Sequence, residues 1–338
     1  MAKTHRIGLF GCGDLLRWTA GDFKNSKRAR IAALYDPDHA RAVKWAGELG
    51  GRAVDSEDAI LGDPEIDIVV LFVPPWVRRG LLERAAKAGK HIITTKPLGP
   101  TVADCEAMAR AVEKAGVVCS VFYRRTGNSG IEAYKKIFDG GTLGKLALYK
   151  QDWLHHYPQW NRWATDPKKN GGPFMDAMIH NLNTARYLMG RPATAATLFS
   201  DNHAQDLQCN DTEFMKLDFK GSGSAHLFIT WAADLAVYST QGNDREHIDI
   251  TYMVTDQGWR LTEGWENGQF TITASREGKA RKFVAKAIKG ASCDRFAGAI
   301  DEGGTLPPDM PGIREACQDI RILENAAKTP GKRIPVKL

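Results

Sequence analysis

The sequence has few of the features that mark several protein classes. It has six cysteines, none of them in a Cys-x-x-Cys pair or at zinc-ligand spacing from a histidine: Cys12, Cys105, Cys119, Cys209, Cys293 and Cys317. We therefore expect small, mostly buried thiols in a reducing compartment, and no metal site. The first residues run directly into an apolar strand without a signal region, and no apolar run is long enough to cross a bilayer. We expect a cytoplasmic protein with no membrane partner.

The charge is only weakly biased. The 338 residues carry 46 Lys and Arg against 40 Asp and Glu, which gives a formal net charge of +6. Basic pairs such as Lys27-Arg28 and Lys168-Lys169 are separated by apolar or acidic residues. This is typical of a solvated surface, and it argues against a nucleic-acid partner. The small excess of positive charge suits binding of anionic small molecules, and dinucleotides are among them.

Over its first third the chain alternates apolar strands with helical stretches. Strands are predicted at 7–10, 30–35, 66–73, 91–95 and 117–123, and helices between them, including 38–49, 76–88 and 101–116. Such alternation predicts parallel βαβ units and a doubly wound α/β sheet of the Rossmann type.

The pattern changes after about residue 125. Helices are predicted at 128–138, 173–189 and 312–327, and strands at 144–153, 214–219, 224–231, 248–254, 259–263 and 270–273. Turn sequences at 220–223 and 255–258 join strands directly and predict hairpins. We expect a dinucleotide-binding domain over 1–125 and an α+β domain with an open, mostly antiparallel sheet over 126–338. Helix 312–327 is expected to pack back on the first domain.

A glycine turn follows the first strand. Gly11 gives the tight turn a residue without Cβ, and Gly13 lets the backbone approach a pyrophosphate at the next helix N-terminus. Leu16 occupies the place of a third glycine, so the fingerprint is incomplete, and a simple turn is the alternative. The position directly after the first βαβ strand favours a dinucleotide site.

Asp36 ends the second strand, about twenty residues after the glycines. A carboxylate there can accept hydrogen bonds from the adenosine ribose, and it disfavours the 2′-phosphate of NADP, so we expect NAD. Arg41 and His39 lie nearby and keep NADP open. The alternative for Asp36 is a helix N-cap ahead of Pro37, and one residue can serve both purposes.

Lys96-Pro97 follows strand 91–95. Ligands of open α/β sheets bind at the carboxyl ends of strands, so Lys96 is expected to point at the nicotinamide region, with a surface lysine as the alternative. Asp176 and His180 lie four apart on one face of helix 173–189. Together they can hold a substrate alcohol and take its proton. Half of a metal site or a structural pair are the alternatives.

An aromatic stretch at 153–163 precedes that helix. Aromatic faces with hydrogen-bonding tips suit a sugar ring, whereas the alternative is a loop that packs between domains. Besides Asp176, the residues expected to contact substrate are Tyr123, His156, Tyr157, Trp160 and Arg162.

Taken in order, these motifs resemble the Gfo/Idh/MocA family, which includes glucose–fructose oxidoreductase and inositol dehydrogenase. The likeness covers essentially the whole chain and rests on Gly11-x-Gly13, Asp36, Lys96-Pro97 and the Gly-Gly pair ahead of Asp176 and His180. It implies a Rossmann domain, a sheet domain that often forms the oligomer interface, and an active site between the two domains. We therefore expect a homodimer or homotetramer through that sheet.

The resemblance also implies residue roles. Lys96 would line substrate and nicotinamide, Asp176 would contact substrate, His180 would be the acid/base, and the Lys96–Pro97 peptide would be cis. The sequence departs from the family at Thr95, where Glu is usual. It departs again after Pro74, where the family tends to carry Asn and His. Trp76 in this stretch is expected either to stack near the cofactor or to close the pocket.

The combined prediction is an NAD(P)-dependent oxidoreductase acting on a sugar, cyclitol or related polyol, with Lys96, Asp176 and His180 catalytic. The expected cofactor contacts are Phe10, Gly11, Cys12, Gly13, Asp14, Leu15, Asp36, Val73, Pro74, Trp76, Lys96 and Pro97. Two alternatives stay open. One is an NAD-dependent glycosidase that oxidises its substrate transiently and eliminates the aglycone, and the other is a non-catalytic NAD-binding sensor.

Overall fold

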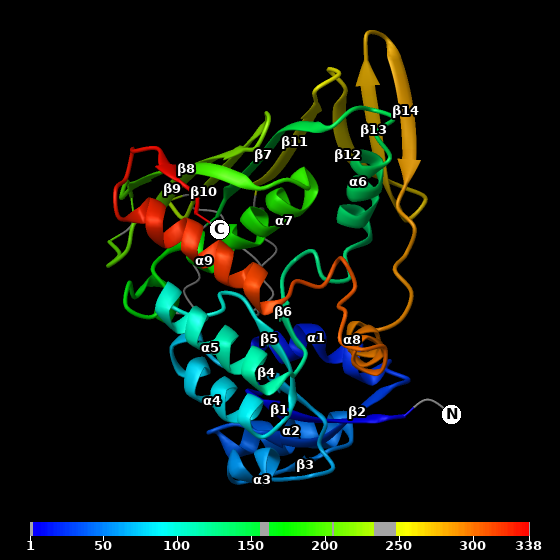
Figure 1. Cartoon of the computed structure of the whole chain (residues 1–338), viewed down its shortest axis with the longest axis vertical. Coiled ribbons are helices and arrows are strands. Elements are labelled where there is room, and N and C mark those ends of the chain that lie inside the picture. The colour runs from blue at the N-terminus through cyan, green and yellow to red at the C-terminus, as the bar shows by residue number, and fades with distance from the viewer. Residues whose placement is uncertain (1–2, 156–161, 205, 233–247, 338) are drawn as a thin grey trace. The chain divides into compact units, whose positions relative to one another are not determined.

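The computed structural model describes residues 3–155, 162–204, 206–232 and 248–337, and the chain forms two compact units (Figure 1). The first unit is Met1–Gly127 together with Lys289–Cys317, and the second is Asn128–Ile288 together with Gln318–Leu338. The sequence placed everything after residue 125 in one domain. The return of residues 289–317 to the first unit therefore differs from that expectation.

The first unit is built on a parallel sheet. Its strands are β1 (His5–Phe10), β2 (Ala29–Tyr35), β3 (Arg52–Ala53), β4 (Ile68–Leu71), β5 (His91–Thr95) and β6 (Cys119–Phe122). They pair in the order β3-β2-β1-β4-β5-β6. The order reverses between β1 and β4, which is where ligands bind at the carboxyl edge of a doubly wound sheet. The predicted Rossmann arrangement is confirmed.

Helices cover both faces of this sheet. They are α1 (Asp14–Lys24), α2 (His39–Leu49), α3 (Asp58–Leu61), α4 (Pro75–Lys87), α5 (Val102–Ala115) and α8 (Ser292–Asp301). Figure 1 shows α4 and α5 side by side, while one core cluster joins α1, α2 and α8 to the sheet. Local sequence signals define both ends of α5. Thr101 accepts a 3.1 Å hydrogen bond from the Asp104 backbone N–H at its start, and the helix ends at Gly116, which has a left-handed conformation.

The return segment belongs to the first unit because it completes that core. Phe296 and Cys293 of α8 are fully buried among side chains of α1, α2 and the sheet. The Asp22 carboxylate accepts hydrogen bonds from the backbone N–H groups of Ser292 and Cys293, which caps the start of α8. Further along, the Pro311 carbonyl accepts a 2.8 Å bond from Val121, so the segment runs beside β6.

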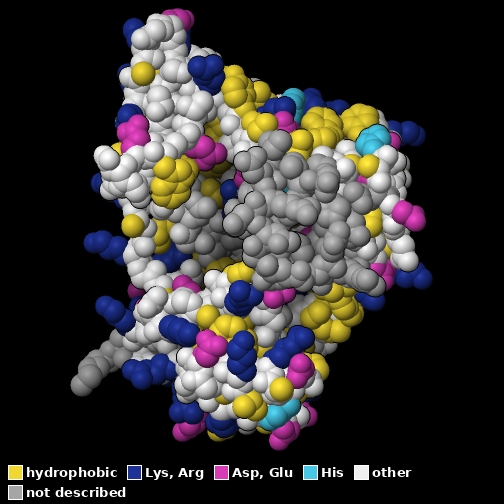
Figure 2. Space-filling model, turned by 180° about the vertical axis from the view of Figure 1, so that it is seen from behind, with side chains coloured by type: hydrophobic (Ala, Val, Ile, Leu, Met, Phe, Trp, Pro, Cys, Tyr) yellow, Lys and Arg dark blue, Asp and Glu magenta, His cyan; other side chains and the backbone are white. Residues whose placement is uncertain are grey.

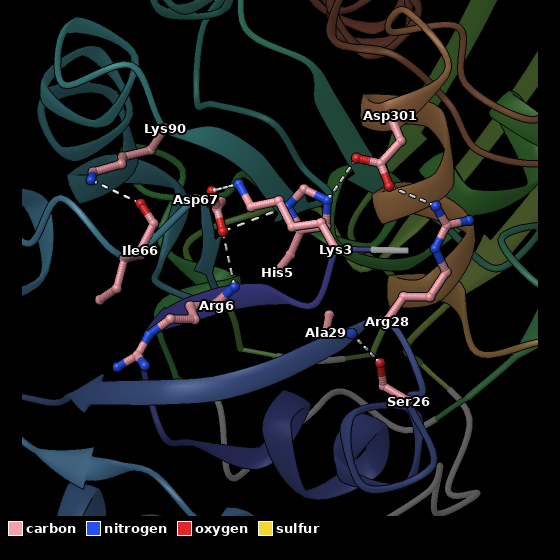
Figure 3. A network of polar contacts seen from close by, with 10 residues as sticks. All are labelled: Lys3, His5, Arg6, Ser26, Arg28, Ala29, Ile66, Asp67, Lys90 and Asp301. Carbon is pink, nitrogen blue, oxygen red and sulfur yellow. Dashed lines mark hydrogen bonds and ion pairs between the residues drawn. The ribbon is translucent and has the colours of Figure 1, made fainter. Parts of the chain in front are cut away.

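A polar network also ties α8 to the sheet (Figure 3). The buried imidazole of His5 lies 3.0 Å from Asp301 at the end of α8 and 3.6 Å from Asp67. Arg28 reaches Asp301 from the other side at 2.6 Å. The hydrogen bond with His5, and then the one from Arg28, hold the pKa of Asp301 below its usual range. The ionised carboxylate is therefore part of the link between α8, β1 and the start of β2.

The second unit is built on a mixed sheet. Its strands are β7 (Leu146–Leu154), β8 (Ala193–Asp201), β9 (Thr212–Phe219), β10 (Ser224–Thr230), β11 (Ile248–Thr255), β12 (Arg260–Glu266), β13 (Gln269–Arg276), β14 (Lys279–Val284) and β15 (Ile334–Pro335). They follow the order β14-β13-β12-β11-β7-β10-β9-β8-β15. Only β7 and β10 run parallel among the pairs described, so the predicted open, mostly antiparallel sheet is confirmed.

Both predicted hairpins are present. Turns at 220–223 and 255–258 join the antiparallel pairs β9–β10 and β11–β12. The remaining helices are α6 (Ser129–Asp139), α7 (Ile179–Met189) and α9 (Ile313–Ala327), and the division between the units falls within α9. Within the described residues, no helix has both the length and the apolar character needed to cross a membrane.

The prediction of mostly buried thiols is also confirmed. All six thiols are free and buried. Burial, followed by the charge of Asp36, raises the pKa of Cys12 to about 12, so this thiol of the glycine turn is neutral at physiological pH.

Candidate functional site

The glycine turn is fixed by the close approach of two strands. Gly11 has φ of 90°, and a Cβ on it would lie 2.3 Å from the carbonyl oxygen of Phe72, just beyond β4. A Cβ on Gly13 would meet no described atom within 4 Å. The fold therefore needs Gly11, whereas the absence of a side chain at Gly13 leaves open space at the N-terminus of α1.

That N-terminus fits the phosphates of a dinucleotide. Gly13 is the N-cap residue of α1, and no side chain caps the helix there among the described residues. Its first N–H groups and its positive dipole end are therefore available to an anion. Leu16, at the position of a third glycine, is fully buried in the core, so α1 packs on the sheet through this side chain.

Asp36, directly after β2, holds the same turn through hydrogen bonds. One carboxylate oxygen accepts a 2.8 Å hydrogen bond from the Cys12 backbone N–H, and the other accepts a 2.9 Å bond from that of Asp38. The helix N-cap is Asp38, so the alternative in which Asp36 caps the helix is wrong. Each carboxylate oxygen can accept more than one hydrogen bond, so Asp36 retains capacity for ribose hydroxyls.

The ends of β4 and β5 complete this edge of the sheet. Val73 and Pro74 follow β4, and Trp76 in the first turn of α4 is 37% exposed. Lys96 and Pro97 follow β5, and the peptide between them is cis, as the resemblance implied. The structure thus gathers the glycine turn, Asp36, the end of β4 and Lys96-Pro97 at the carboxyl edge of one parallel sheet.

Sequence reasoning missed Arg78, which organises this edge. Its side chain is 1% exposed, and its guanidinium donates hydrogen bonds to backbone carbonyls on both sides of Lys96 and to the Val73 carbonyl. Burial lowers the pKa of Arg78 to about 10, so it remains charged at neutral pH. The sequence could have indicated that Arg78 is buried, because it shares the helical spacing of the buried residues Leu81, Leu82 and Ala85.

In the second unit, two glycines lead into the helix that carries Asp176 and His180. Gly171 and Gly172 have φ of 93° and 110°, and a Cβ on Gly172 would lie 3.3 Å from that of Cys209. The sequence predicted one helix over 173–189. The structure begins it with a π-helical turn, Phe174–Met178, and continues it as α7. Such turns are frequent at functional sites.

Asp176 lies in the π-helical turn and His180 in the first turn of α7, and both are half-buried. The amide of Asn170, itself 3% exposed, donates to the Asp176 carboxylate at 3.3 Å. Thr184 donates to the His180 carbonyl at 2.9 Å. The spacing of four puts both side chains on about the same face of the helix.

Glu213, also missed from the sequence, holds the start of this helix. Its carboxylate on β9 accepts a 2.7 Å hydrogen bond from the Phe174 backbone N–H and a 3.3 Å bond from Ser200 Oγ. Burial raises the pKa of Glu213 to about 7. The strand pattern contained a signal, since Glu213 alternates in phase with the buried Met215 and Leu217.

The aromatic stretch is described only in part. Trp153 stacks on His155 with ring centroids 5.2 Å apart. His156, Tyr157 and Trp160 lie outside the described residues, and Arg162 begins a short 3-10 helix, Arg162–Thr165, with its side chain likewise outside.

Tyr123, in the first unit, is 4% exposed and follows β6. Its backbone N–H donates to Thr126 Oγ1 at 3.4 Å. Across the described ranges, no group of three or more His, Cys, Asp or Glu side chains is arranged to hold a metal ion.

Comparison with known families identifies both units. Residues 5–123 match the model described as "Oxidoreductase family, NAD-binding Rossmann fold", and residues 131–245 match the "GFO/IDH/MocA C-terminal domain". The chain belongs to the Gfo/Idh/MocA family. The predictions of the family and of an NAD-binding Rossmann fold are thereby confirmed.

One curated relative in the family is named scyllo-inositol 2-dehydrogenase (NAD(+)), from Bacillus subtilis. It is 32% identical over 195 residues, which is 57% of this chain, and the chain spans 56% of that relative's length.

Two solved structures match nearly the whole chain. Aldose-aldose oxidoreductase from Caulobacter crescentus, complexed with glycerol, has a TM-score of 0.83 at 22% identity, covering 98% of this chain and 100% of that one. Levoglucosan dehydrogenase, complexed with NADH and levoglucosan, has a TM-score of 0.81 at 19% identity, covering 99% and 100%. At these identities the likeness shows the shared fold alone.

Glu213 should make stability depend on pH. Because burial raises its pKa from 4.5 to about 7, the folded state holds a proton that the unfolded state releases. The free energy of unfolding should therefore fall as pH rises from 4.5 to 7, by up to about 3 kcal/mol, and Glu213→Gln should remove this loss. Urea unfolding of both proteins across pH 4.5–8 measures the difference.

The exposed Glu302 provides the matched control, because Glu302→Gln should leave the pH dependence of the wild type unchanged. Parallel curves for wild type and Glu213→Gln would show that Glu213 does not titrate in this window.

Proposed function

We propose that the chain is an NAD-dependent oxidoreductase that transfers a hydride between nicotinamide and a carbinol or carbonyl carbon of a sugar, cyclitol or related polyol. The observation that carries the proposal is the carboxyl edge of the first sheet, where the open N-terminus of α1 at Gly13 and the Lys96-Pro97 turn occur together. The named activities of the relatives, inositol and levoglucosan dehydrogenases, support the substrate class.

In the proposed reaction, His180, Lys96 and Asp176 each have a separate role. His180 would take the hydroxyl proton during oxidation and return it during reduction, since an imidazole is suited to both near neutral pH. Lys96 would donate a hydrogen bond to the alkoxide as charge develops, and Asp176 would hold a neighbouring hydroxyl of the substrate. NAD, when bound, supplies the hydride acceptor at C4 of its nicotinamide.

Substrate contacts beyond Asp176 are proposed at Tyr123, His156, Tyr157, Trp160 and Arg162. For the cofactor, the proposed contacts are Phe10 to Leu15, Asp36, Val73, Pro74, Trp76, Lys96 and Pro97.

A screen of sugars and inositols with NAD and NADP, followed at the absorbance of the reduced nicotinamide, tests the activity. We expect turnover with at least one polyol. His180→Ala should lower kcat by about 100-fold or more, because it removes the general acid/base. The exposed His203 supplies the control, and His203→Ala should retain wild-type turnover.

Three outcomes would count against the proposal. If His180→Ala keeps most of its turnover with every accepted substrate, the acid/base assignment is wrong. Glycoside cleavage without release of NADH would indicate transient oxidation and elimination instead. NADH binding without turnover on any polyol would indicate a sensor.

Cofactor choice is proposed to depend on Asp36. Replacing this carboxylate by Asp36→Ser should weaken NADH binding about tenfold and strengthen NADPH binding, because the acceptor for ribose hydroxyls and the repulsion of a 2′-phosphate are both lost. Titration of cofactor fluorescence measures both affinities. Asp58→Ser, at an exposed carboxylate that pairs with Arg84, should change neither. Unchanged affinities for both cofactors in Asp36→Ser would exclude the ribose role.

We further propose that the second sheet forms a homodimer or homotetramer interface. Cross-strand pairing aligns Phe199, Phe214, Phe228 and Ile250, with Asp152 between the last two. This face lies opposite the one on which Tyr149 bonds Asn181 of α7. Phe199 and Ile250 are 47% and 50% exposed, and Figure 2 shows hydrophobic side chains gathered among Lys, Arg and His along the upper rim. Exposed apolar patches rimmed by polar residues commonly mark interfaces.

The oligomer is tested by light scattering after size-exclusion chromatography. Phe199→Lys combined with Ile250→Lys should convert the wild-type oligomer to monomer, since the interface would have to bury two added charges in place of apolar side chains. Val43→Lys, on the exposed side of α2, should leave the mass unchanged. A monomeric wild type, or an oligomer that survives the double substitution, would exclude this interface.

A further inference from the structure

We propose that Arg78 is a positioning residue, whose buried guanidinium clamps the backbone on both sides of Lys96 and joins that turn to the end of β4. The inference rests on the proposed function only for its catalytic consequence. The clamp itself is a matter of contacts within the first unit.

The contacts of Arg78 are unusual for a buried cation. Buried arginines are commonly paired with carboxylates, because an unpaired charge in the interior is costly. Here Nη1 donates to the carbonyl oxygens of Thr95 at 2.7 Å, Leu98 at 3.1 Å and Pro97, while Nη2 donates to that of Val73 at 2.6 Å. Within the described residues, the hydrogen-bond acceptors of the Arg78 guanidinium are therefore backbone carbonyls and not a carboxylate.

The four carbonyls belong to two segments that leave the sheet. Thr95 and Pro97 flank Lys96 directly, and the Lys96 N–H donates to the Phe122 carbonyl at 3.2 Å. The backbone of Lys96 is therefore held before, at and after the residue. Val73 is part of the proposed cofactor contact after β4, so one side chain fixes the spacing between β4 and the turn that carries Lys96.

The requirement for arginine follows from geometry. Carbonyls that leave a sheet in a buried turn need donors, since their strand partners have ended. A guanidinium presents five N–H donors in a planar fork and can serve two segments at once. The ammonium of a lysine presents its donors from one nitrogen, so it does not reproduce the separate contacts that Nη1 and Nη2 make with the two segments. We therefore expect Arg78→Lys to fold while losing the link between β4 and the Lys96 turn.

The first test is amide hydrogen exchange on the protein without cofactor. In Arg78→Lys, peptides covering residues 93–98 and 71–74 should exchange at least tenfold faster, because the carbonyl restraints are lost locally. Exchange in β2 and α1 should stay unchanged. The neighbouring Arg79, which is exposed and pairs with Glu83 and Asp104, provides the control, and Arg79→Met should exchange like wild type.

The second test is catalytic and uses the same variants with NAD and a polyol that wild type oxidises. Arg78→Lys should lower kcat at least tenfold with little change in the substrate KM. It should also raise the deuterium isotope effect for substrate labelled at the oxidised carbon, because a misplaced Lys96 slows the hydride step. In a Lys96→Met background, adding Arg78→Lys should lower kcat little further, since Arg78 acts through Lys96. Titration with NADH checks that binding of the cofactor is retained.

The outcomes separate the clamp from the proposed function. If wild type turns over no polyol, the proposed function fails, and the exchange experiment still decides the clamp. Arg78→Met, which removes every donor of the guanidinium, should show the same changes as Arg78→Lys, and if it does not fold, Arg78→Lys carries both tests. The clamp is excluded if exchange at 93–98 is unchanged in Arg78→Lys. The positioning role is excluded if Arg78→Lys slows the Lys96→Met variant as much as it slows wild type.

Discussion

The approach of β1 to β4 is the constraint on which the first unit depends. The Phe72 carbonyl occupies the space that a side chain on Gly11 would need. This approach exists because β1 and β4 are neighbours in the sheet although two strands separate them in the sequence. It turns the chain away from β1, brings the Cys12 N–H to Asp36, and starts α1 at Gly13 with open space in front of it. The same strand order sets the end of β4 beside the end of β5.

Two buried ionisable side chains organise the candidate site segments through the backbone. Arg78 supplies donors to carbonyls at the end of β4 and after β5, and Glu213 supplies an acceptor to an N–H at the start of a helix. Burial moves the pKa of each toward the neutral form, to about 10 for Arg78 and about 7 for Glu213. The first therefore stays charged at neutral pH, whereas the second titrates there. Of these two groups, Glu213 at the start of the Asp176 helix is the one that responds to pH near neutrality.

Much of this organisation was predictable from the sequence. Alternating apolar segments gave the parallel sheet, turn residues gave both hairpins, and the glycine turn and Lys96-Pro97 lay where strand ends placed them. Arg78 and Glu213 could have been found too, because each falls in phase with apolar neighbours on its element. Strand β14 could not have been predicted, since its sequence is rich in exposed Lys and Arg and shows no alternation of apolar and polar residues. Nor could the π-helical turn, whose geometry depends on Glu213 and the left-handed Gly172.

The return of residues 289–317 was hidden for a different reason. Apolar periodicity shows that α8 has a buried face, but it does not show which core receives that face. Phe296 and Cys293 could have completed either sheet, and the choice depends on distant partners such as Asp22, His5 and Arg28. Long-range pairing of this kind is visible only in three dimensions.

The interrupted first unit has a consequence for how the protein is made. Translation adds about 5–20 residues per second, so residues 128–288 separate the emergence of β6 from that of α8 by on the order of ten seconds. During this interval the sheet, α1 and α2 lack Phe296, Cys293 and Met310, which belong to their core. The nascent first unit thus presents an incomplete apolar face while the second is synthesised.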